Sequence, residues 1–226
     1  VEGYDLTLPL ADFDKTCVQG INGPIWALIA LDSGNYDIPE TQSGTQATRE
    51  MYVQHLLSEQ SESGAWALTK GGSDVDLTAM ALQALAKYTD TDGVAEAVER
   101  ALAYLSDEQL PNGGYRSYGD ENSESISQVI IALCENGIKL DDERFVKPGG
   151  TLADALERFA CEDGSFSHTL KDGSKVKAKP VWDYFRAHVN NYDPDTVAEI
   201  TGVDADLIVE AATTYATPLH PETGYG

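Results

Sequence analysis

The hydrophobic positions of the chain recur at helical spacing in two kinds of segment. In the first kind one side is apolar and the other is charged, as in residues 94–105, where Val98 and Leu105 share the apolar side. The second kind, in which nearly every side is apolar, comprises residues 25–31, 76–85 and 124–133. Because a helix that is apolar all round must be covered on most sides, the pattern predicts amphipathic outer helices packed over apolar inner helices.

Three polar turns connect these segments and resemble one another. Each ends in a glycine, any residue and an aromatic side chain, at residues 64–66, 113–115 and 164–166. The three glycines are 49 and 51 residues apart. Self-similarity at such a period is typical of repeat architectures, so we expect an all-α fold built from stacked helical hairpins.

The first turn carries a resemblance to a known family. Its pattern, Gln60-x3-Gly64-x-Trp66, resembles the QW motif of the squalene-cyclase and protein-prenyltransferase superfamily. Residues 19–39 and 73–88 look closer still to bacterial surface proteins with prenyltransferase/squalene-oxidase repeats, which resemble the helical domain of cobalamin-carrier proteins. The resemblance covers about residues 1–178. It implies a partial α/α toroid, an extracellular or cell-surface setting, and a corrinoid or another hydrophobic small molecule as the candidate ligand.

The turn residues have two interpretations. In the first, glycine allows the backbone to turn tightly, the aromatic ring packs over a neighbouring helix end, and the Gln60 amide binds free peptide groups at that end. In the second, aromatic side chains form a ligand-binding surface. The candidates for such a surface are Trp26, Trp66, Tyr115 and Phe166. The recurrence of the turns favours the structural interpretation.

An acidic stretch is the candidate for catalysis. Residues 74–79 (Asp-Val-Asp-Leu-Thr-Ala) resemble the DxDD-Thr-Ala motif of class II terpene cyclases, which implies that Asp76 is the proton donor and makes Asp74 and Asp76 the candidate catalytic residues. Leu77 stands where that family has its last aspartate. The other interpretation is helix capping, because acids at a helix start interact well with its free N–H groups and its dipole.

The composition changes after Phe166, where a third inner helix should follow. Residues 171–180 contain four lysines and end in proline, which indicates a linker. Beyond it we expect a short helical tail: Asp193 and Pro194 start one helix, Gly202 ends it, and a second helix follows. Residues 181–226 resemble a segment of molybdopterin-dependent oxidoreductases. The predicted organisation is toroid repeats over residues 1–170, the linker, and the tail over 181–226.

The charge balance excludes some partners. With 15 Lys and Arg against 38 Asp and Glu, the net charge is −23, so we expect no binding to nucleic acid, which needs a basic face. No apolar run is long enough to span a membrane. The histidines are scattered and the three cysteines form no CxxC, so we expect no metal site. Cys134 lies in an apolar run and is expected to be buried.

These observations lead to three hypotheses about function. Only two whole repeats are present, and such an open arc exposes the apolar sides of its end helices, which favours a partner, a missing domain or low stability. The first hypothesis is a non-catalytic binding or scaffold module without a cofactor of its own. The alternative is a terpene-cyclase- or prenyltransferase-like enzyme that acts on an isoprenoid with Asp76 as general acid. A further alternative is a fragment of a molybdopterin-dependent oxidoreductase.

Overall fold

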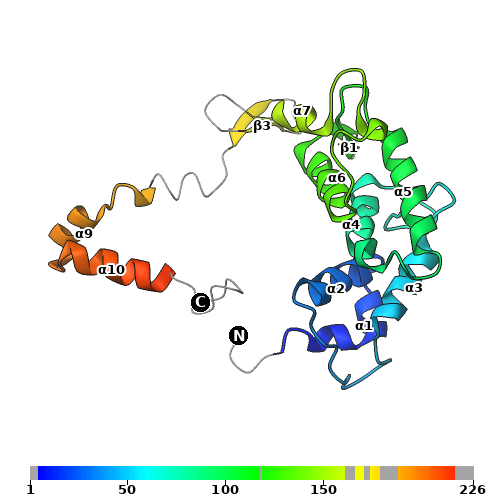
Figure 1. Ribbon diagram of the computed structural model, residues 1–226, viewed down its shortest axis with the longest axis horizontal. Helices are drawn as coiled ribbons and strands as arrows, with labels where there is room; N and C mark the ends of the chain where they lie inside the picture. Colours follow the sequence, from blue (N-terminus) through cyan, green and yellow to red (C-terminus); the bar gives the residue numbers. More distant parts are fainter. Residues whose placement is uncertain (1–4, 118, 161–165, 171–173, 179–187, 217–226) are drawn as a thin grey trace. The chain divides into compact units, whose positions relative to one another are not determined.

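The computed structural model describes residues 5–117, 119–160, 166–170, 174–178 and 188–216. The chain divides into two compact units, Val1–Phe159 and Ala160–Gly226. We describe each unit by itself (Figure 1). The domain boundaries expected at residues 170 and 180 stay a prediction.

The first unit is a row of apolar helices covered on one side by amphipathic helices. In chain order its elements are η1 (Leu8–Ala11), α1 (Phe13–Cys17), α2 (Asn22–Ser33), α3 (Arg49–Glu59), α4 (Val75–Leu85), η2 (Ala86–Tyr88), α5 (Val94–Glu108), β1 (Arg116–Ser117), β2 (Asp120–Glu121), α6 (Ser123–Glu135), η3 (Glu143–Phe145) and α7 (Leu152–Glu157). Helix α4 contacts both α2 and α6, and α3, α5 and α7 pack on α2, α4 and α6 respectively. Figure 1 shows α3 and α5 on one side of the row formed by α2, α4 and α6.

Most of these helices begin at a side chain that caps them. The cap residues of α3, α4, α6 and α7 are Thr48, Asp74, Asn122 and Thr151, and each accepts a hydrogen bond from the backbone N–H three residues later. Asp74 and Asn122 are 48 residues apart, as are the inner helices that they begin. A cap of this kind is worth about 1 kcal/mol, so the local sequence sets where these helices start.

The core lies between the inner and outer helices. Eight of the residues of α4 are buried, a larger share than in its neighbours: Val75, Leu77, Thr78, Ala79, Ala81, Leu82, Ala84 and Leu85. The largest buried side chains are Trp66, Tyr52, Tyr115 and Phe145. The nearly all-apolar segments of the sequence are therefore the inner helices, as predicted.

The prediction of an all-α toroid was wrong, because the structure is mostly helical but also contains two small antiparallel sheets. Strand β1 pairs with β2, with Arg116 opposite Glu121, and the reversal contains Gly119 at a φ of +96°. In the second unit, β3 (Phe166–Thr169) pairs with β4 (Lys175–Ala178). The sequence between β3 and β4 includes Asp172-Gly173, a dipeptide typical of hairpin turns. Pairing of β3 and β4 takes the place of the third inner helix.

The second unit ends in two helices, α9 (Pro194–Thr201) and α10 (Ala205–Ala216), which contact each other. Asp193 caps α9 through its bond from the Thr196 N–H, and Gly202 ends the helix at a φ of +71°, as predicted. None of the described residues of this unit is buried. Its exposed apolar side chains include Val189, Tyr192, Ile200, Val203, Leu207 and Val209.

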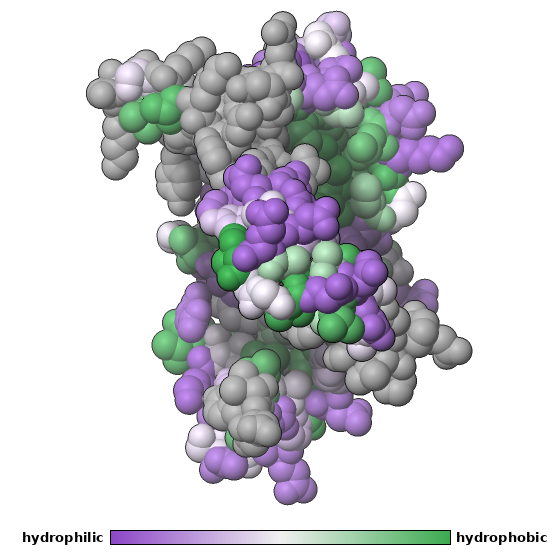
Figure 2. Space-filling model, turned by 90° about the vertical axis from the view of Figure 1, so that its left-hand side faces the viewer, coloured by the Kyte–Doolittle hydropathy of each residue, from purple (hydrophilic) through white to green (hydrophobic). Residues whose placement is uncertain are grey.

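The surface of the described chain mixes polar and apolar side chains, and Figure 2 shows hydrophobic residues reaching the surface among hydrophilic ones. In the described residues, every helix is too short or too polar to cross a membrane. Cys134 is exposed rather than buried, which corrects the sequence-based expectation. The reason is that it lies on the one side of α6 that no other helix of the described chain covers.

Candidate functional site

Each inner helix leaves a single stripe of side chains exposed or half-buried. The stripes consist of Trp26, Ile29, Ala30 and Ser33 on α2; Asp76, Met80 and Gln83 on α4 with Lys87 on η2; and Glu124, Ser127, Gln128, Ile130, Ile131, Cys134 and Glu135 on α6. Each member of a stripe has another member three or four residues away, so the members lie on one side of their helix. We call the three stripes together the inner-helix face.

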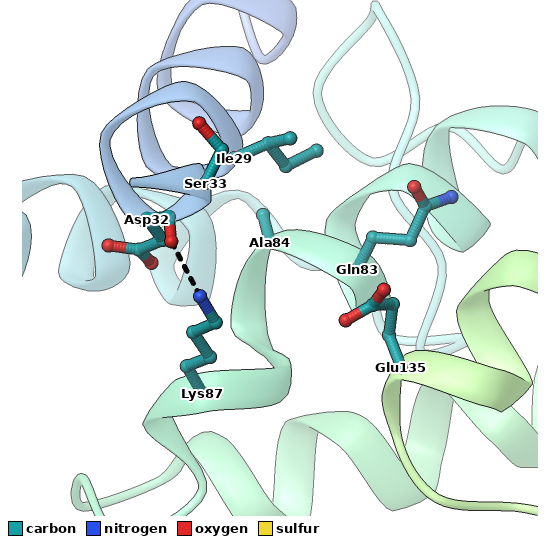
Figure 3. A pocket seen from close by; sticks show the side chains of 7 residues that line it. All are labelled: Ile29, Asp32, Ser33, Gln83, Ala84, Lys87 and Glu135. Carbon is teal, nitrogen blue, oxygen red and sulfur yellow. Dashed lines mark hydrogen bonds between the residues drawn. The ribbon is translucent and has the colours of Figure 1, made fainter. Parts of the chain in front are cut away.

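Two observations show that the stripes lie side by side. The Gln83 Nε2 donates to Gln128 Oε1 at 2.9 Å, which joins α4 to α6. A pocket of about 200 Å³ is lined by residues of α2, α4, η2 and α6. Its lining residues are Ile29, Asp32, Ser33, Gln83, Ala84, Lys87 and Glu135, and Figure 3 shows how their side chains surround it. The inner-helix face is therefore one continuous surface.

The face carries apolar side chains that no other part of the described chain covers. Trp26 is 51% exposed and Ile131 is 45% exposed. Met80 is half-buried one helical turn before Gln83. The exposed indole and the amide pair together give the face both a hydrophobic contact area and hydrogen-bonding groups, which is the composition of small-molecule sites.

A network of charges holds the end of the face where the pocket lies. The Asp32 carboxylate accepts from Arg49 Nε at 2.8 Å and from the Tyr88 hydroxyl at 2.7 Å. The Lys87 ammonium donates to the backbone oxygen of Asp32 at 2.7 Å. Burial raises the pKa of Tyr88, and its bond to Asp32 raises that pKa further. Burial alone would lower the pKa of Arg49, but its bond to Asp32, the charge of Asp32 and the nearby Tyr88 together outweigh burial and raise the pKa. Both groups therefore stay protonated, and the network stays paired, over the physiological range.

The structure separates the two acids of the candidate catalytic motif. Asp74 lies at the start of α4, where its Oδ1 accepts from the Leu77 N–H at 2.8 Å, so the capping role is confirmed for this residue. Asp76 is half-buried on the inner-helix face, and Glu124 occupies the matching position of α6. Within the described residues, the Oδ1 of Asp76 is buried and accepts no hydrogen bond. A general-acid role for Asp76 stays a prediction.

Two of the candidate aromatic residues lie in the core instead of on the face. Trp66 and Tyr115 are fully buried, and each donates to a helix carbonyl: Trp66 Nε1 to Leu56 O at 2.7 Å, and the Tyr115 hydroxyl to Leu105 O at 2.5 Å. This confirms the structural interpretation of the first two turns. Both rings present no surface to solvent, so their assignment as ligand-binding residues has no geometric support here.

Of the remaining two aromatic candidates, the structure describes the side chain of Trp26 but not that of Phe166. Trp26 lies on the inner-helix face, exposed and separate from the turn residues. Phe166 begins β3, and its side chain lies outside what the structure describes. Ligand binding by either stays a prediction.

Sequence reasoning missed the polar residues around the pocket, such as Gln83 and Glu135. A signal for them exists, because polar residues interrupt the apolar inner segments at helical spacing: Asp76, Gln83 and Lys87 in one, and Glu124, Gln128 and Glu135 in the other. In the part of the chain that the structure describes, no three His, Cys, Asp or Glu side chains gather as a metal site. The face therefore offers amide, carboxylate and indole groups to a ligand.

Comparison with known proteins adds information about part of the chain. No family model matches the sequence, and no solved structure matches the fold. Two curated proteins of Eggerthella lenta are each 52% identical over 64 residues, a dopamine dehydroxylase and an uncharacterized oxidoreductase. The matched segment is 28% of this chain and 6% of either relative. The chain thus spans about 6% of the length of the relatives that it matches.

Proposed function

We propose that the first unit is a non-catalytic binding module that holds a small hydrophobic ligand against the inner-helix face. The observation that carries the proposal is the exposed indole of Trp26 on a surface that α2, α4 and α6 build together. The family resemblance of the sequence points to a corrinoid or an isoprenoid as the ligand class. The use of Asp74 as a helix cap favours binding over catalysis.

Physical chemistry supports a ligand at this place. Exposed Trp26 and Ile131 present apolar surface whose burial is favourable by about 25 cal/mol per Å². The surface is preorganised, because the Gln83–Gln128 bond and the Asp32 network hold its helices. Preorganisation reduces the entropy lost on binding. A rigid, partly apolar surface of this kind favours a rigid, partly apolar ligand.

Ligand titration of the full chain tests the proposal, with cobinamide as the corrinoid and farnesol as the isoprenoid. We expect at least one of them to bind, and Trp26→Ala to weaken its binding by about tenfold or more, because aromatic anchors dominate such contacts. The control is Leu68→Ala, since Leu68 is 62% exposed but lies outside the inner helices. Equal affinity of the Trp26→Ala and native chains would refute the proposal.

The Asp76→Asn variant distinguishes the enzyme alternative from the binding proposal. On the binding proposal this change leaves ligand affinity nearly intact and lowers helix stability slightly. Mass spectrometry of the full chain after incubation with squalene should then show no cyclised product. A cyclised product that disappears in Asp76→Asn would instead establish Asp76 as a general acid.

We also propose that the second unit is a segment of an oxidoreductase. The 64 residues that match the Eggerthella lenta oxidoreductases at 52% identity are close in length to the unit Ala160–Gly226, and the sequence resemblance falls on residues 181–226. Helices α9 and α10 bury none of their described residues, as expected of a segment that the rest of a larger protein covers. In the described part of the unit, no three His, Cys, Asp or Glu side chains gather as a metal site.

A transplant tests this second proposal. The 64 matched residues of this chain would replace the corresponding segment of the dopamine dehydroxylase, and the thermal stability of the purified chimera would be measured. We expect a folded protein within a few degrees of the parent. A control segment with the same composition in shuffled order should fail to fold. A chimera no more stable than that control would overturn the proposal.

A further inference from the structure

The pocket at the end of the inner-helix face presents hydrogen-bond acceptors from Gln83, Ser33 and Glu135. Gln83 donates its Nε2 to Gln128, which leaves its Oε1 on the pocket side (Figure 3). The Ser33 hydroxyl donates to Ala30 O at 2.8 Å, so its oxygen lone pairs remain. The Glu135 carboxylate makes no ion pair in the part of the chain that the structure describes.

Lys87 is the positively charged residue among those that line the pocket, and a hydrogen bond joins its ammonium group to α2. Lys87 donates to the backbone oxygen of Asp32, at the end of α2, where a positive charge suits the helix dipole (Figure 3). The Asp32 carboxylate is itself neutralised by Arg49. Of the two acids that line the pocket, Glu135 is thus the one that makes no ion pair among the described residues.

The backbone adds negative potential at the same place. Helix α2 ends at Ser33, α4 at Leu85 and α6 at Glu135, so three helix C-termini approach the pocket. A helix C-terminus carries a partial negative charge from its unpaired carbonyl groups. Glu135 stands in the last turn of α6, where that charge disfavours an acid, and a bound cation would relieve the repulsion.

We propose that this pocket binds the ammonium end of a small organic amine. The ammonium group donates to the Glu135 carboxylate and to Gln83 Oε1, and the adjoining carbon atoms lie against Ile29 and Ala84. The inference rests on the proposed function, because it assigns a polar end to the ligand of the same inner-helix face. Charge-assisted hydrogen bonds of this kind are about twice as strong as neutral ones, so the amine should dominate selectivity.

The test compares ligands that share a carbon skeleton. Calorimetric titration of the full chain at physiological salt would use hexylamine, hexan-1-ol and hexanoic acid. We expect hexylamine to bind about tenfold more tightly than hexan-1-ol, and hexanoic acid to bind most weakly. Salt at this concentration screens the general attraction of a chain with net charge −23 for any cation.

Two variants that remove the same charge separate a specific site from that general attraction. Glu135→Gln should abolish the preference for hexylamine, whereas Glu96→Gln, on the exposed side of the outer helix α5, should preserve it. Gln83→Leu should reduce the preference by several-fold. Thermal unfolding of each variant checks that the unit remains folded.

The outcomes distinguish this inference from the proposed function. If cobinamide or farnesol binds but hexylamine and hexan-1-ol bind equally, the amine site is overturned while the binding module stands. If Glu96→Gln weakens amine binding as much as Glu135→Gln, the attraction is general and the site is again overturned. If no ligand of any class binds, both fail.

Discussion

The turns at residues 60–66 and 109–115 make the same contacts with different aromatic residues. Trp66 and Tyr115 each donate to the carbonyl of the residue ten positions earlier. Gly64 and Gly113 both have a φ of +88°. The indole N–H and the phenol O–H are thus interchangeable in this position, because either reaches a free carbonyl while its ring fills the core.

The side-chain nitrogens of the two turn glutamines make matching hydrogen bonds, whereas their side-chain oxygens do not. Gln60 Nε2 donates to Gly64 O and Ala97 O, both at 2.8 Å, and Gln109 Nε2 donates to Gly113 O at 2.9 Å and Phe145 O at 3.0 Å. The oxygen of Gln60 accepts from the Arg100 guanidinium. Within the described residues, the oxygen of Gln109 is buried without a donor. The two hydrogen bonds from the glutamine nitrogen to backbone carbonyls are therefore common to both turns. Whether the glutamine oxygen accepts a hydrogen bond depends on the neighbouring side chains.

Loss of the aromatic ring should have the largest effect. Trp66→Ala removes a fully buried indole and leaves a cavity between the helices, so we expect a loss of about 3–5 kcal/mol in the free energy of unfolding. Tyr115→Ala should cost a similar amount. Urea unfolding measures both. A cost for Trp66→Ala below that of an ordinary surface substitution would contradict a role in the core.

Replacement of the turn glycines should have the next largest effect on the free energy of unfolding. A Cβ at Gly64 would lie 2.5 Å from Arg100 O, and one at Gly113 would lie 2.4 Å from Thr151 O. Clash and a positive φ together predict that alanine at either position costs about 3 kcal/mol. Gly71 is the matched control, since its φ is +77° and a Cβ there would meet nothing within 4 Å. Gly71→Ala should cost about 1 kcal/mol, and equal costs at all three positions would exclude the clash.

Gln60→Ala and Gln109→Ala should each cost about 2 kcal/mol, because each removes two hydrogen bonds worth about 1 kcal/mol apiece. Gln54→Ala, on the exposed side of α3, serves as the control and should change the free energy of unfolding by less than about 0.5 kcal/mol.

Arg100→Ala makes the first turn resemble the second, and since Arg100 is exposed it should cost less than about 1 kcal/mol. A larger cost for Arg100→Ala than for Gln60→Ala would show that the bond to the side-chain oxygen of Gln60 stabilises the turn more than the two bonds from its nitrogen.

The smallest effect concerns alkaline pH, to which only the second turn should respond. Burial raises the pKa of Tyr115, and burial with the nearby charges of Glu108 and Asp74 raises the pKa of Tyr104 to about 12. The unfolded chain loses these protons near pH 10 and the folded chain only above it, so stability should fall as pH rises from about 10 to about 12.

Tyr115→Phe tests this pH dependence. It should cost about 1 kcal/mol at about pH 8, from the lost bond to Leu105 O, and should reduce the further loss between about pH 10 and 12. Unfolding by urea at both ends of that range gives the comparison. An unchanged pH dependence in Tyr115→Phe would show that other groups cause it.

Much of the first unit follows from local sequence. The helix starts at Asp74 and Asn122 depend on bonds that span three residues, and the turn contacts of Trp66 and Tyr115 span ten. Such interactions leave a pattern that can be read from a short window. The inner helices were predicted for the same reason, since an apolar run must be buried wherever it lies.

The tertiary structure alone decided which side chains meet. Ile29, Gln83 and Glu135 come from three helices far apart in sequence, yet they line one pocket, and the exposure of Cys134 depends on which side of α6 remains uncovered. Residues 166–169 and 175–178 pair as strands instead of forming a third inner helix, because each strand satisfies the backbone of the other. Periodicity within a segment specifies that a helix has a buried side, but the identity of the neighbour on each side is set by the packing of the whole unit.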